Sequence, residues 1–550
     1  MLNLRRNSNF VPFCALKQGG EYMSKVKYIA ATLGPIFKTI GLAESTGALW
    51  AASYMFSYLS KSICEYLLEH SEFSISEEDI IVPYYHKNAA GTEDDAAADV
   101  IVSDGVGRFP DHIIFRAKNF DVTDFSALRA SVTRSLADAL NLKDKEDYLF
   151  RYLLIACAAF DVDEEKGENP ILKSGLALDS LELFQPIIRV ESCNEIVKAV
   201  SNRSIRELPL TQGFKNWPLL GEDRKSIRSI EDIADTSKDG KACKQLKKHD
   251  YYAVVRSDAD AVSKIIASLK ADELRDFSRT CVLYCGEMSK LVHRYSGVTI
   301  YSGGDDLLAL LPAESSPGKT VFHFARDAKD LFQKSFKTYI DAIKAANAEK
   351  KPGEESIPVP SLSLGISICY SKFPLYEALD DSAYLLFDYA KNRCGKNCVA
   401  VRLQKHSGQS ECLALKGVDG LTAFTSFLDD MPKSFDEGLL HSVIYAFCSF
   451  APLFIGFNRL ATPADFETVR ELFRNMFDSS IHVDGKYSDY LYKTLPAFYS
   501  RLTANADIRV FEEAEHSAGK ASDAAANAVR AMEFVLRIAK FYIEKRGERD

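Results

Sequence analysis

The chain has 550 residues, of which 47% are hydrophobic and 26% are charged, and its formal net charge is −9. This length implies several domains around a large core, and this balance is typical of a soluble globular protein. The negative charge argues against a protein that wraps nucleic acid over its whole surface. No apolar run reaches transmembrane length, and the basic start lacks a signal-peptide core. We therefore expect a cytoplasmic protein without membrane contact, whose 12 singly placed cysteines form no disulfide framework.

Residues 1–22 lack periodicity and are predicted to form a tail. Over residues 23–204, strand patterns alternate with helical patterns, beginning with the strand KVKYIAATLG and a helix over residues 42–68. This order predicts a ferredoxin-like fold. The segment has no paired-glycine hairpin that carries carboxylates, so we expect it to have no metal site of its own.

A charged, proline-containing stretch over residues 205–249 is predicted to be a linker. It ends at His249, which together with Asp250 spells the HD pair of metal phosphohydrolases. A phosphohydrolase site needs further histidines at separate positions. We interpret the pair as the entrance to the next strand, and we expect no nuclease activity from it.

The segment 250–410 opens with a short apolar strand at residues 253–255, after which the chain reaches Asp258 and Asp260. From Ala261 the apolar residues follow a helical spacing. The pattern predicts a strand, an acidic turn and a helix N-terminus, where a phosphate is electrostatically favoured.

The stretch YSGGDDLLALLP, residues 301–312, predicts a β-hairpin with Asp305 and Asp306 at its tip. Gly303 and Gly304 leave room for a phosphate beside the backbone N–H groups, and the two carboxylates are hard ligands suited to Mg²⁺ or Mn²⁺. Taken alone, these four residues fit an ordinary turn equally well. An acidic strand end, one helix and an acidic hairpin are, however, arranged as in a two-metal polymerase palm.

A third segment combines the alternating strand SLSLGISICY, residues 361–370, with a helix that ends at Lys391 before a Gly395–Lys396 turn. The lysine is predicted to contact the triphosphate as a point charge, and a solvated helix end is the alternative. Nucleotidyl transfer needs neutralised phosphate charge and an attacking hydroxyl held in line. The predicted catalytic and metal-binding residues are therefore Asp258, Asp305 and Asp306. The predicted nucleotide contacts are the backbone around Ala259, Gly303 and Gly304, the side chain of Lys391, and a base or ribose contact from Ser302.

Residues 411–550 consist of segments with helical apolar spacing, such as GLLHSVIYAFCSFAPLF and AANAVRAMEFVLRIAKF. They predict an all-helical C-terminal domain whose aromatic residues form its core, with a docking face for a small helical partner as the alternative. The predicted fold class is α+β: two ferredoxin-like palm domains, residues 23–204 and 250–410, followed by this helical domain.

Four strings occur in a characteristic order: D-x-D, S-G-G-D-D, S-L-G-I and A-K-x-x-x-G-K-N. This order resembles the palm of the large, polymerase-like subunit of type III CRISPR effector complexes, in particular the Cmr-type subunit, and more distantly diguanylate cyclases. LGPIFKTIGLAESTGALWAASYMFSYLS, GRFPDHIIF and KHSGQS also fit that subunit. The chain departs from the family's D-G-D-N-M-G string, because Ala259 and Ser263 replace glycines. That departure bears on the nucleotide preference rather than on the metal site.

The resemblance implies an RNA-activated nucleotidyltransferase that makes a cyclic oligoadenylate messenger from ATP with Mg²⁺ or Mn²⁺. It implies backbone and small helical subunits as partners, and contact with crRNA and target RNA through the complex. Two alternatives stay open: a subunit that joins AMP from ATP to S-adenosylmethionine, and a non-catalytic scaffold with a decayed palm. An acidic loop of the first domain carries several carboxylates, which are either solvated or face the metals. If they face the metals, they would favour the positively charged S-adenosylmethionine over a second ATP as acceptor. These residues are Glu93, Asp94, Asp95 and Asp104.

Relatives often carry an HD nuclease domain before the first palm and a zinc module between the palms. We expect the HD domain to be lacking, because only a short tail precedes the opening strand. The sequence contains no C-x-x-C pair, so we also expect no structural zinc. Cys394 and Cys398 are the remaining candidates for zinc ligands.

Overall fold

The computed structural model describes residues 25–86, 105–183, 205–212, 214, 217–220, 227–235, 251–316, 318–431, 437–460, 466–477, 487–505, 507–510 and 524–547. The first unit holds a four-stranded antiparallel sheet in the order β2-β3-β1-β4. Its elements are β1 (Val26–Gly34), α1 (Ile36–Ile40), α2 (Thr46–Glu69), β2 (Ile80–Val82), β3 (His112–Arg116), α4 (Phe125–Ala139), α5 (Glu146–Tyr152), β4 (Leu154–Val162) and α6 (Pro170–Glu182).

Strand β1 is the centre of this first sheet, and it is buried on both faces. Ile29, Ala31 and Leu33 point toward a core that includes α2 and α4, whereas Tyr28 and Ala30 pack toward α6. The burial of alternate residues on opposite faces follows from the period of two in a strand. Helix α2 begins after Ser45, whose side chain accepts a hydrogen bond from the backbone N–H of Ala48 at 3.3 Å.

The second sheet has seven strands in the order β13-β12-β11-β10-β5-β7-β6. Within it, the four strands β10-β5-β7-β6 follow the same 4-1-3-2 order as the first sheet, which confirms the prediction of two ferredoxin-like units. The elements are β5 (Tyr251–Asp260), α9 (Val262–Ser268), α10 (Leu274–Arg294), β6 (Val298–Gly303), β7 (Asp306–Pro312), α11 (Val321–Ser335), α12 (Lys337–Ala348), β10 (Ser361–Tyr370), α13 (Leu375–Tyr384), β11 (Cys398–Gln404) and β12 (Ser410–Lys416). A small ribbon of β8 (Glu314–Ser316) and β9 (Lys319–Thr320) precedes α11, and α8 (Ile230–Ala234) precedes β5.

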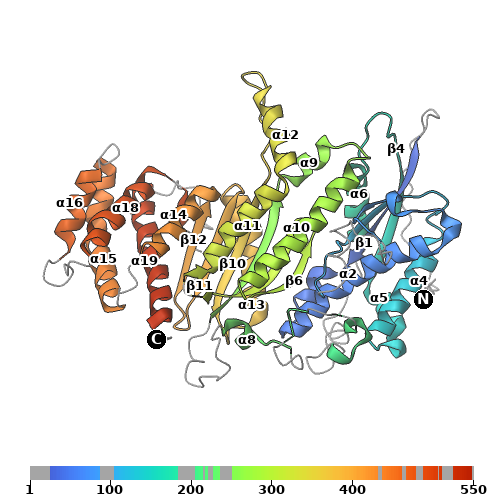
Figure 1. The fold of residues 1–550 in the computed structure, drawn as a ribbon, viewed down its shortest axis with the longest axis horizontal. Helices are drawn as coiled ribbons and strands as arrows, with labels where there is room; N and C mark the ends of the chain where they lie inside the picture. The colour runs from blue at the N-terminus through green and yellow to red at the C-terminus, as the bar shows by residue number, and fades with distance from the viewer. Residues whose placement is uncertain are drawn as a thin grey trace, which may run out of the picture.

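The two faces of the second sheet are covered by different parts of the chain. On one face, Val255 and Ala309 share a core with residues of α10 and α11. On the other face, Val254, Ile300 and Leu308 share a core with residues of the first unit. Figure 1 shows the first unit, in blue, beside β6 and α10. The two palm-like units are therefore joined by a common hydrophobic core.

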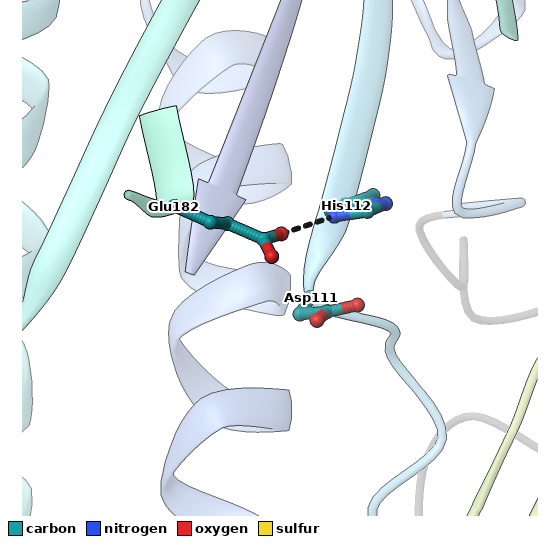
Figure 2. Close-up of side chains that lie close together, drawn as sticks. All are labelled: Asp111, His112 and Glu182. Carbon is teal, nitrogen blue, oxygen red and sulfur yellow. Dashed lines mark hydrogen bonds and ion pairs between the residues drawn. The ribbon is translucent and has the colours of Figure 1, made fainter. Parts of the chain in front are cut away.

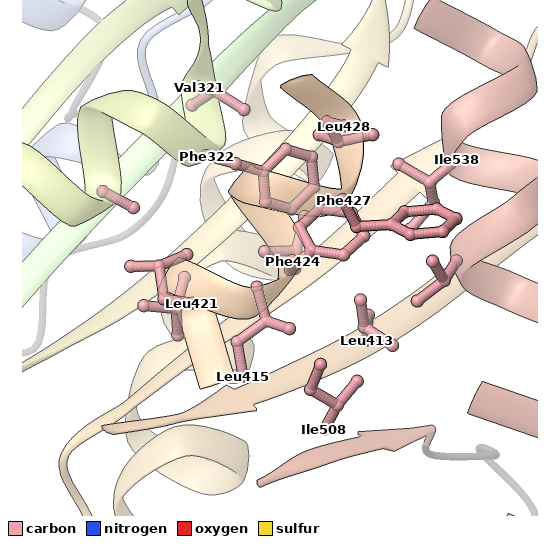
Figure 3. Close-up of a cluster of buried hydrophobic side chains, with 14 of the residues drawn as sticks. Val321, Phe322, Leu413, Leu415, Leu421, Phe424, Phe427, Leu428, Ile508 and Ile538 are labelled. Atoms are coloured by element: carbon pink, nitrogen blue, oxygen red, sulfur yellow. The ribbon is translucent and has the colours of Figure 1, made fainter. Parts of the chain in front are cut away.

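The C-terminal part is mainly helical, as predicted, with α14 (Gly417–Asp429), α15 (Glu437–Leu460), α16 (Phe466–Met476), α18 (Leu495–Ala504) and α19 (Ala524–Gly547). Figure 3 shows how it is attached: Phe322 of α11, Phe424 of α14 and Ile538 of α19 meet over Leu413 of β12. The part also supplies β13 (Ile508–Val510), which pairs with β12 and extends the palm sheet. Helical spacing did not reveal this strand, because it is only three residues long.

Helix α15 differs from the expectation that no apolar run reaches transmembrane length. The 21 residues Leu439–Arg459 contain an 18-residue window with a mean hydropathy of 1.7, which meets the length and composition of a membrane span. Phe447 and Phe454 of this helix are buried against Tyr499. One face of α15 therefore belongs to the core of the helical part.

Candidate active site

Strand β5 carries the first acidic pair to the edge of the sheet. The strand continues to Asp260, so Asp258 and Asp260 lie on the strand itself and not in the predicted turn after it. Pairing with β10 sets Asp258 opposite Ser363 and Asp260 opposite Ser361. Residues two apart on a strand share a face, so the two carboxylates point to the same side of the sheet.

Asp260 is 2% exposed and forms the centre of a buried polar network. Its Oδ2 accepts hydrogen bonds from the Ser361 hydroxyl at 2.8 Å, the Ser363 hydroxyl at 2.7 Å and the backbone N–H of Asn397 at 2.8 Å. Its Oδ1 has no hydrogen-bond partner among the described residues. A buried, unsatisfied carboxylate oxygen is costly unless a cation or donor is supplied.

The hairpin predicted from the sequence is present, and its tip pairs Gly303 with Asp306. Gly304 has φ +66° and no atom within 4 Å of an added Cβ, so the backbone there is open to a ligand. At Gly303 an added Cβ would lie 2.3 Å from the Tyr301 hydroxyl and 3.0 Å from the Arg108 carbonyl oxygen. The predicted room for a phosphate thus exists at Gly304, whereas Gly303 is required by packing.

The hairpin tip is tied to the end of β5 through Asp305. The Asp305 carboxylate accepts a hydrogen bond from the backbone N–H of Ala259. Burial nevertheless raises the pKa of Asp305 to about 6. Asp306 keeps access to solvent. The pKa of Asp306 is raised well above its usual range, first because the surrounding protein desolvates the carboxylate. The negative charges of Asp305, and of Asp111 in the first unit, raise it further.

Lys391 reaches the same place from the helical segment that follows α13. Helix α13 continues as a π-helical segment, Leu385–Arg393, and such segments re-aim side chains at functional sites. The Lys391 ammonium forms an ion pair with Asp258 and donates to the Ala259 carbonyl oxygen at 3.2 Å. Burial lowers the pKa of Lys391 to about 8, with a contribution from Lys396. Lys391 therefore contacts the predicted metal ligand itself.

The turn predicted at Gly395 and Lys396 extends to Asn397, and all three residues have positive φ, at 68°, 67° and 50°. Asn397 and its partner Lys329 were not found by sequence reasoning. The buried Lys329 of α11 donates to the Asn397 side-chain oxygen at 2.8 Å and to the carbonyl of Leu362 at 2.6 Å. The turn after Lys391 is thus stabilised by hydrogen bonds from Asn397 to Lys329 and to Asp260. A charged residue on an apolar helix face was the available signal for Lys329.

Two predicted nucleotide contacts need correction. Ser302 is 1% exposed, and its hydroxyl donates to the Cys285 carbonyl oxygen of α10 at 3.4 Å. Its side chain is part of the core, so it is not placed to contact a base or ribose. The backbone N–H of Ala259, which is the group that a phosphate could use, already donates to the Asp305 carboxylate, so a phosphate would have to displace Asp305.

The oxygen donors present fit a divalent cation such as Mg²⁺ or Mn²⁺. Asp258, Asp305 and Asp306 lie at the ends of β5 and β7, which are adjacent antiparallel strands, and Asp260 offers an unsatisfied oxygen. Within the described residues these carboxylates are not gathered as a group of ligand atoms. The Lys391 ammonium instead provides positive charge beside Asp258 and, at 3.9 Å, Asp260 Oδ1.

Several predicted residues lie outside the described part of the chain: the acidic loop of Glu93, Asp94, Asp95 and Asp104, and the His249–Asp250 pair. The thiols of Cys394 and Cys398 are hydrogen-bonded to each other, and this bond lowers the pKa of Cys394. The expectation of no structural zinc stays a prediction.

Two ferredoxin-like units of the same strand order, one of them with an acidic hairpin, define a palm-domain protein of the nucleotide-cyclase and polymerase type. Comparison with protein families is more specific. Residues 251–400 match the model of "Cas10/Cmr2, second palm domain", and residues 28–141 match "CRISPR-associated protein Cmr2, N-terminal". Over these two segments the chain is therefore similar to the Cas10/Cmr2 family.

Individual relatives agree with this family. The Cmr2 subunit of the CRISPR Cmr system of Pyrococcus furiosus is 29% identical over 200 residues, which are 32% of this chain and 21% of that protein. A chain of a type III-B Cmr-beta complex, solved by cryo-EM in the apo state, is 13% identical with a TM-score of 0.55, covering 94% of this chain and 82% of its own. A Csm1–Csm4 cassette crystallised with cA4 is 12% identical with a TM-score of 0.50, covering 87% and 70%. At these identities the structural matches show the fold.

Proposed function

We propose that this chain is the nucleotidyltransferase subunit of a type III CRISPR antiviral complex, activated by RNA, and that it makes a cyclic oligoadenylate from ATP. The observation that carries the proposal is the junction of the two acidic segments: Asp305 of the hairpin bonds to the backbone of Ala259, next to Asp258 and Lys391. The Csm1–Csm4 cassette, which shares the fold, was crystallised with cA4. This supports a cyclic oligoadenylate as the product.

Each residue has a definable task in this reaction. The open backbone at Gly304 gives the triphosphate room to approach the hairpin. Asp258, Asp305 and Asp306 would hold divalent cations, with Asp260 contributing from below. Bound cations supply neutralisation of charge at the α-phosphate and orientation of the attacking hydroxyl. Lys391 is then released from Asp258 to pair with a phosphate oxygen, which keeps the net charge of the site balanced.

Two alternatives are distinguished by the product. A subunit that joins AMP to S-adenosylmethionine would use the same donor site, so the palm carboxylates do not separate it from oligoadenylate synthesis. A scaffold with a decayed palm would retain the fold without the Asp305–Ala259 and Lys391–Asp258 contacts, both of which are present here. The contacts therefore favour an active palm.

The partners follow from the family and from exposed surface. We propose that backbone and small helical subunits assemble with this chain in the cytoplasm, and that crRNA and target RNA reach it through them. On α15, Tyr445 is 72% exposed and Leu453 is 55% exposed. This exposed apolar face supports the docking of a helical partner on the C-terminal part.

The test is to reconstitute the complex with target RNA and to incubate it with labelled ATP, with and without S-adenosylmethionine. We expect a cyclic oligoadenylate that is lost in the Asp305→Ala, Asp306→Ala double variant while assembly and RNA binding persist. An Asp272→Asn variant, on an exposed site before α10, is the matched control. Product from the double variant would refute the site, and a product that appears only with S-adenosylmethionine would replace the proposed reaction.

A further inference from the structure

Three side chains of the first unit lie close together, as Figure 2 shows. Asp111 and His112 are consecutive where β3 begins, and Glu182 is the last residue of α6. One ligand atom from each, two carboxylate oxygens and a ring nitrogen, all lie within 4.8 Å of one another. The fold thus brings together residues that are 70 positions apart.

The contacts within this cluster leave it open to a ligand. His112 Nε2 lies 3.1 Å from Glu182 Oε1, which also accepts a hydrogen bond from the Thr32 hydroxyl at 3.2 Å. The side chains of His112 and Glu182 are each 39% exposed, so an ion can reach them from solvent. The Asp111 carboxylate accepts hydrogen bonds from the backbone N–H groups of Asp111 and His112, and among the described residues no side chain donates to it. Two carboxylates and an imidazole therefore lie together, and the contact between His112 and Glu182 is the one hydrogen bond between these three side chains.

The donor set selects a class of cation. Mg²⁺ and Ca²⁺ prefer oxygen ligands alone, whereas an imidazole nitrogen with two carboxylates suits Mn²⁺, Zn²⁺ and other first-row divalent ions. Three protein ligands leave coordination positions for water or substrate. The Thr32 hydroxyl orients the Glu182 carboxylate, which is the usual role of a hydrogen-bond partner behind a metal ligand.

We propose that Asp111, His112 and Glu182 form a binding site for a first-row divalent transition-metal ion in the first unit. The site uses none of the palm carboxylates as ligands, and it does not depend on the proposed nucleotidyl transfer. It contrasts with the sequence-based expectation that this unit has no metal site, because Glu182 is distant in sequence and no motif links it to Asp111. The negative charge of Asp111 also acts on Asp306, so an ion held here would alter the charge on the first-unit side of the hairpin.

The test uses the full chain with Asp305→Ala and Asp306→Ala, which removes the proposed palm ligands. Co²⁺ is titrated and followed by visible absorption, and Zn²⁺ is titrated by calorimetry. We expect one equivalent to bind, with the affinity reduced at least tenfold in His112→Gln and in Glu182→Gln. Thr32→Val should reduce it less, since the ligand stays in place. The control is His86→Gln in the same unit, whose ring nitrogen lies 2.6 Å from the single carboxylate of Glu77 and which should leave the affinity unchanged.

A second measurement needs no ligand substitution. Mn²⁺ added in small amounts should broaden the imidazole NMR signal of His112 before those of the other nine histidines, since the chain has 10. The proposal is overturned if the Asp305→Ala, Asp306→Ala chain binds neither Co²⁺ nor Zn²⁺. It is also overturned if folded His112→Gln and Glu182→Gln variants bind as tightly as their parent, or if His86 broadens first. The Co²⁺ absorption, the Zn²⁺ calorimetry and the Mn²⁺ broadening do not require nucleotide synthesis. A failure of the proposed function would therefore leave these three measurements unaffected.

Discussion

Lys391 forms an ion pair with Asp258, where we propose that a divalent cation binds. We predict that Lys391→Met will weaken ATP binding by roughly 10- to 100-fold, the value of one charge-assisted contact to phosphate. In the absence of nucleotide the same change should tighten Mn²⁺ binding by roughly tenfold, because the carboxylates lose their competing ammonium. Calorimetric titrations with each ligand check both directions.

The opposite signs are the discriminating feature of this prediction. Lys344→Met, at an exposed position on α12, removes the same charge away from the site and should change neither affinity. If Lys391→Met weakened Mn²⁺ binding as well, the lysine would be supporting the site instead of standing in for the cation.

Asp305 gives the metal-free protein a defined pH dependence. Its pKa is about 6 in the folded chain against 3.8 ordinarily, so the native state binds the proton more tightly between these values. The free energy of unfolding should therefore fall as the pH rises from about 4 to about 6, by at most about 1.4 kcal/mol per pH unit from this group. Denaturant titrations at several pH values should show that the unfolding free energy depends less on pH in Asp305→Asn. The exposed Asp272→Asn should keep the pH dependence of the parent chain. An equal slope in all three proteins would assign the pH dependence to other groups.

At the scale of elements, the turn into α9 contains a strained residue. Ala261 has φ +60° at the N-cap of this helix, a conformation that costs an L-residue about 1 kcal/mol. Ala261→Asn should therefore raise the unfolding free energy by about 1 kcal/mol, because asparagine tolerates this region. Ala267→Asn, exposed within the same helix, should lower it by several tenths of a kcal/mol. Equal effects of the two changes in thermal unfolding would contradict the role of φ.

Strand β10 and the π-helical segment meet without space for a side chain. A Cβ at Gly365 would lie 2.3 Å from the Ser382 carbonyl oxygen and 2.5 Å from the Leu386 nitrogen. We predict that Gly365→Ala will destabilise the chain by about 1–3 kcal/mol and lower nucleotide synthesis, because it displaces the segment that carries Lys391. Gly175→Ala in α6, where an added Cβ meets nothing within 4 Å, should be neutral or slightly stabilising.

Which parts of this arrangement can be predicted from sequence depends on the range of the interactions. The strands of the palm and the hairpin at Gly303 and Gly304 are local patterns, and they were predicted correctly. The burial of Asp260 was not, because its serine partners lie 101 and 103 residues away. The burial of Ser302 was not predicted either, because its hydroxyl contacts the Cys285 carbonyl oxygen of α10, an element outside the hairpin motif.

At the scale of the whole molecule, the shared core couples the first unit to the palm. Ile300 of β6 is fully buried in the core that also contains Trp50 of the first unit. The chain has two tryptophans, and the rings of Trp50 and Trp217 are 4.4 Å apart, so tryptophan fluorescence reports this region. We predict that Ile300→Ala, in the palm, will lower stability by about 2–5 kcal/mol and shift the fluorescence transition of the first unit with it. The tryptophan fluorescence transition is compared with the circular dichroism transition of the whole chain. If the two occur at different denaturant concentrations, the units unfold independently.

The backbone also crosses between the two units. The Ser302 amide, on the edge strand β6, donates its hydrogen to the Gly107 carbonyl oxygen of the first unit at 2.9 Å. An amide whose acceptor belongs to another unit exchanges with solvent deuterium only when the two separate or when both unfold. The exchange rate at Ser302, compared with that of neighbouring β6 amides, therefore measures how often the first unit lifts from the palm. If activation of the complex loosens this junction, deuterium will enter at Ser302 before it enters the rest of the strand.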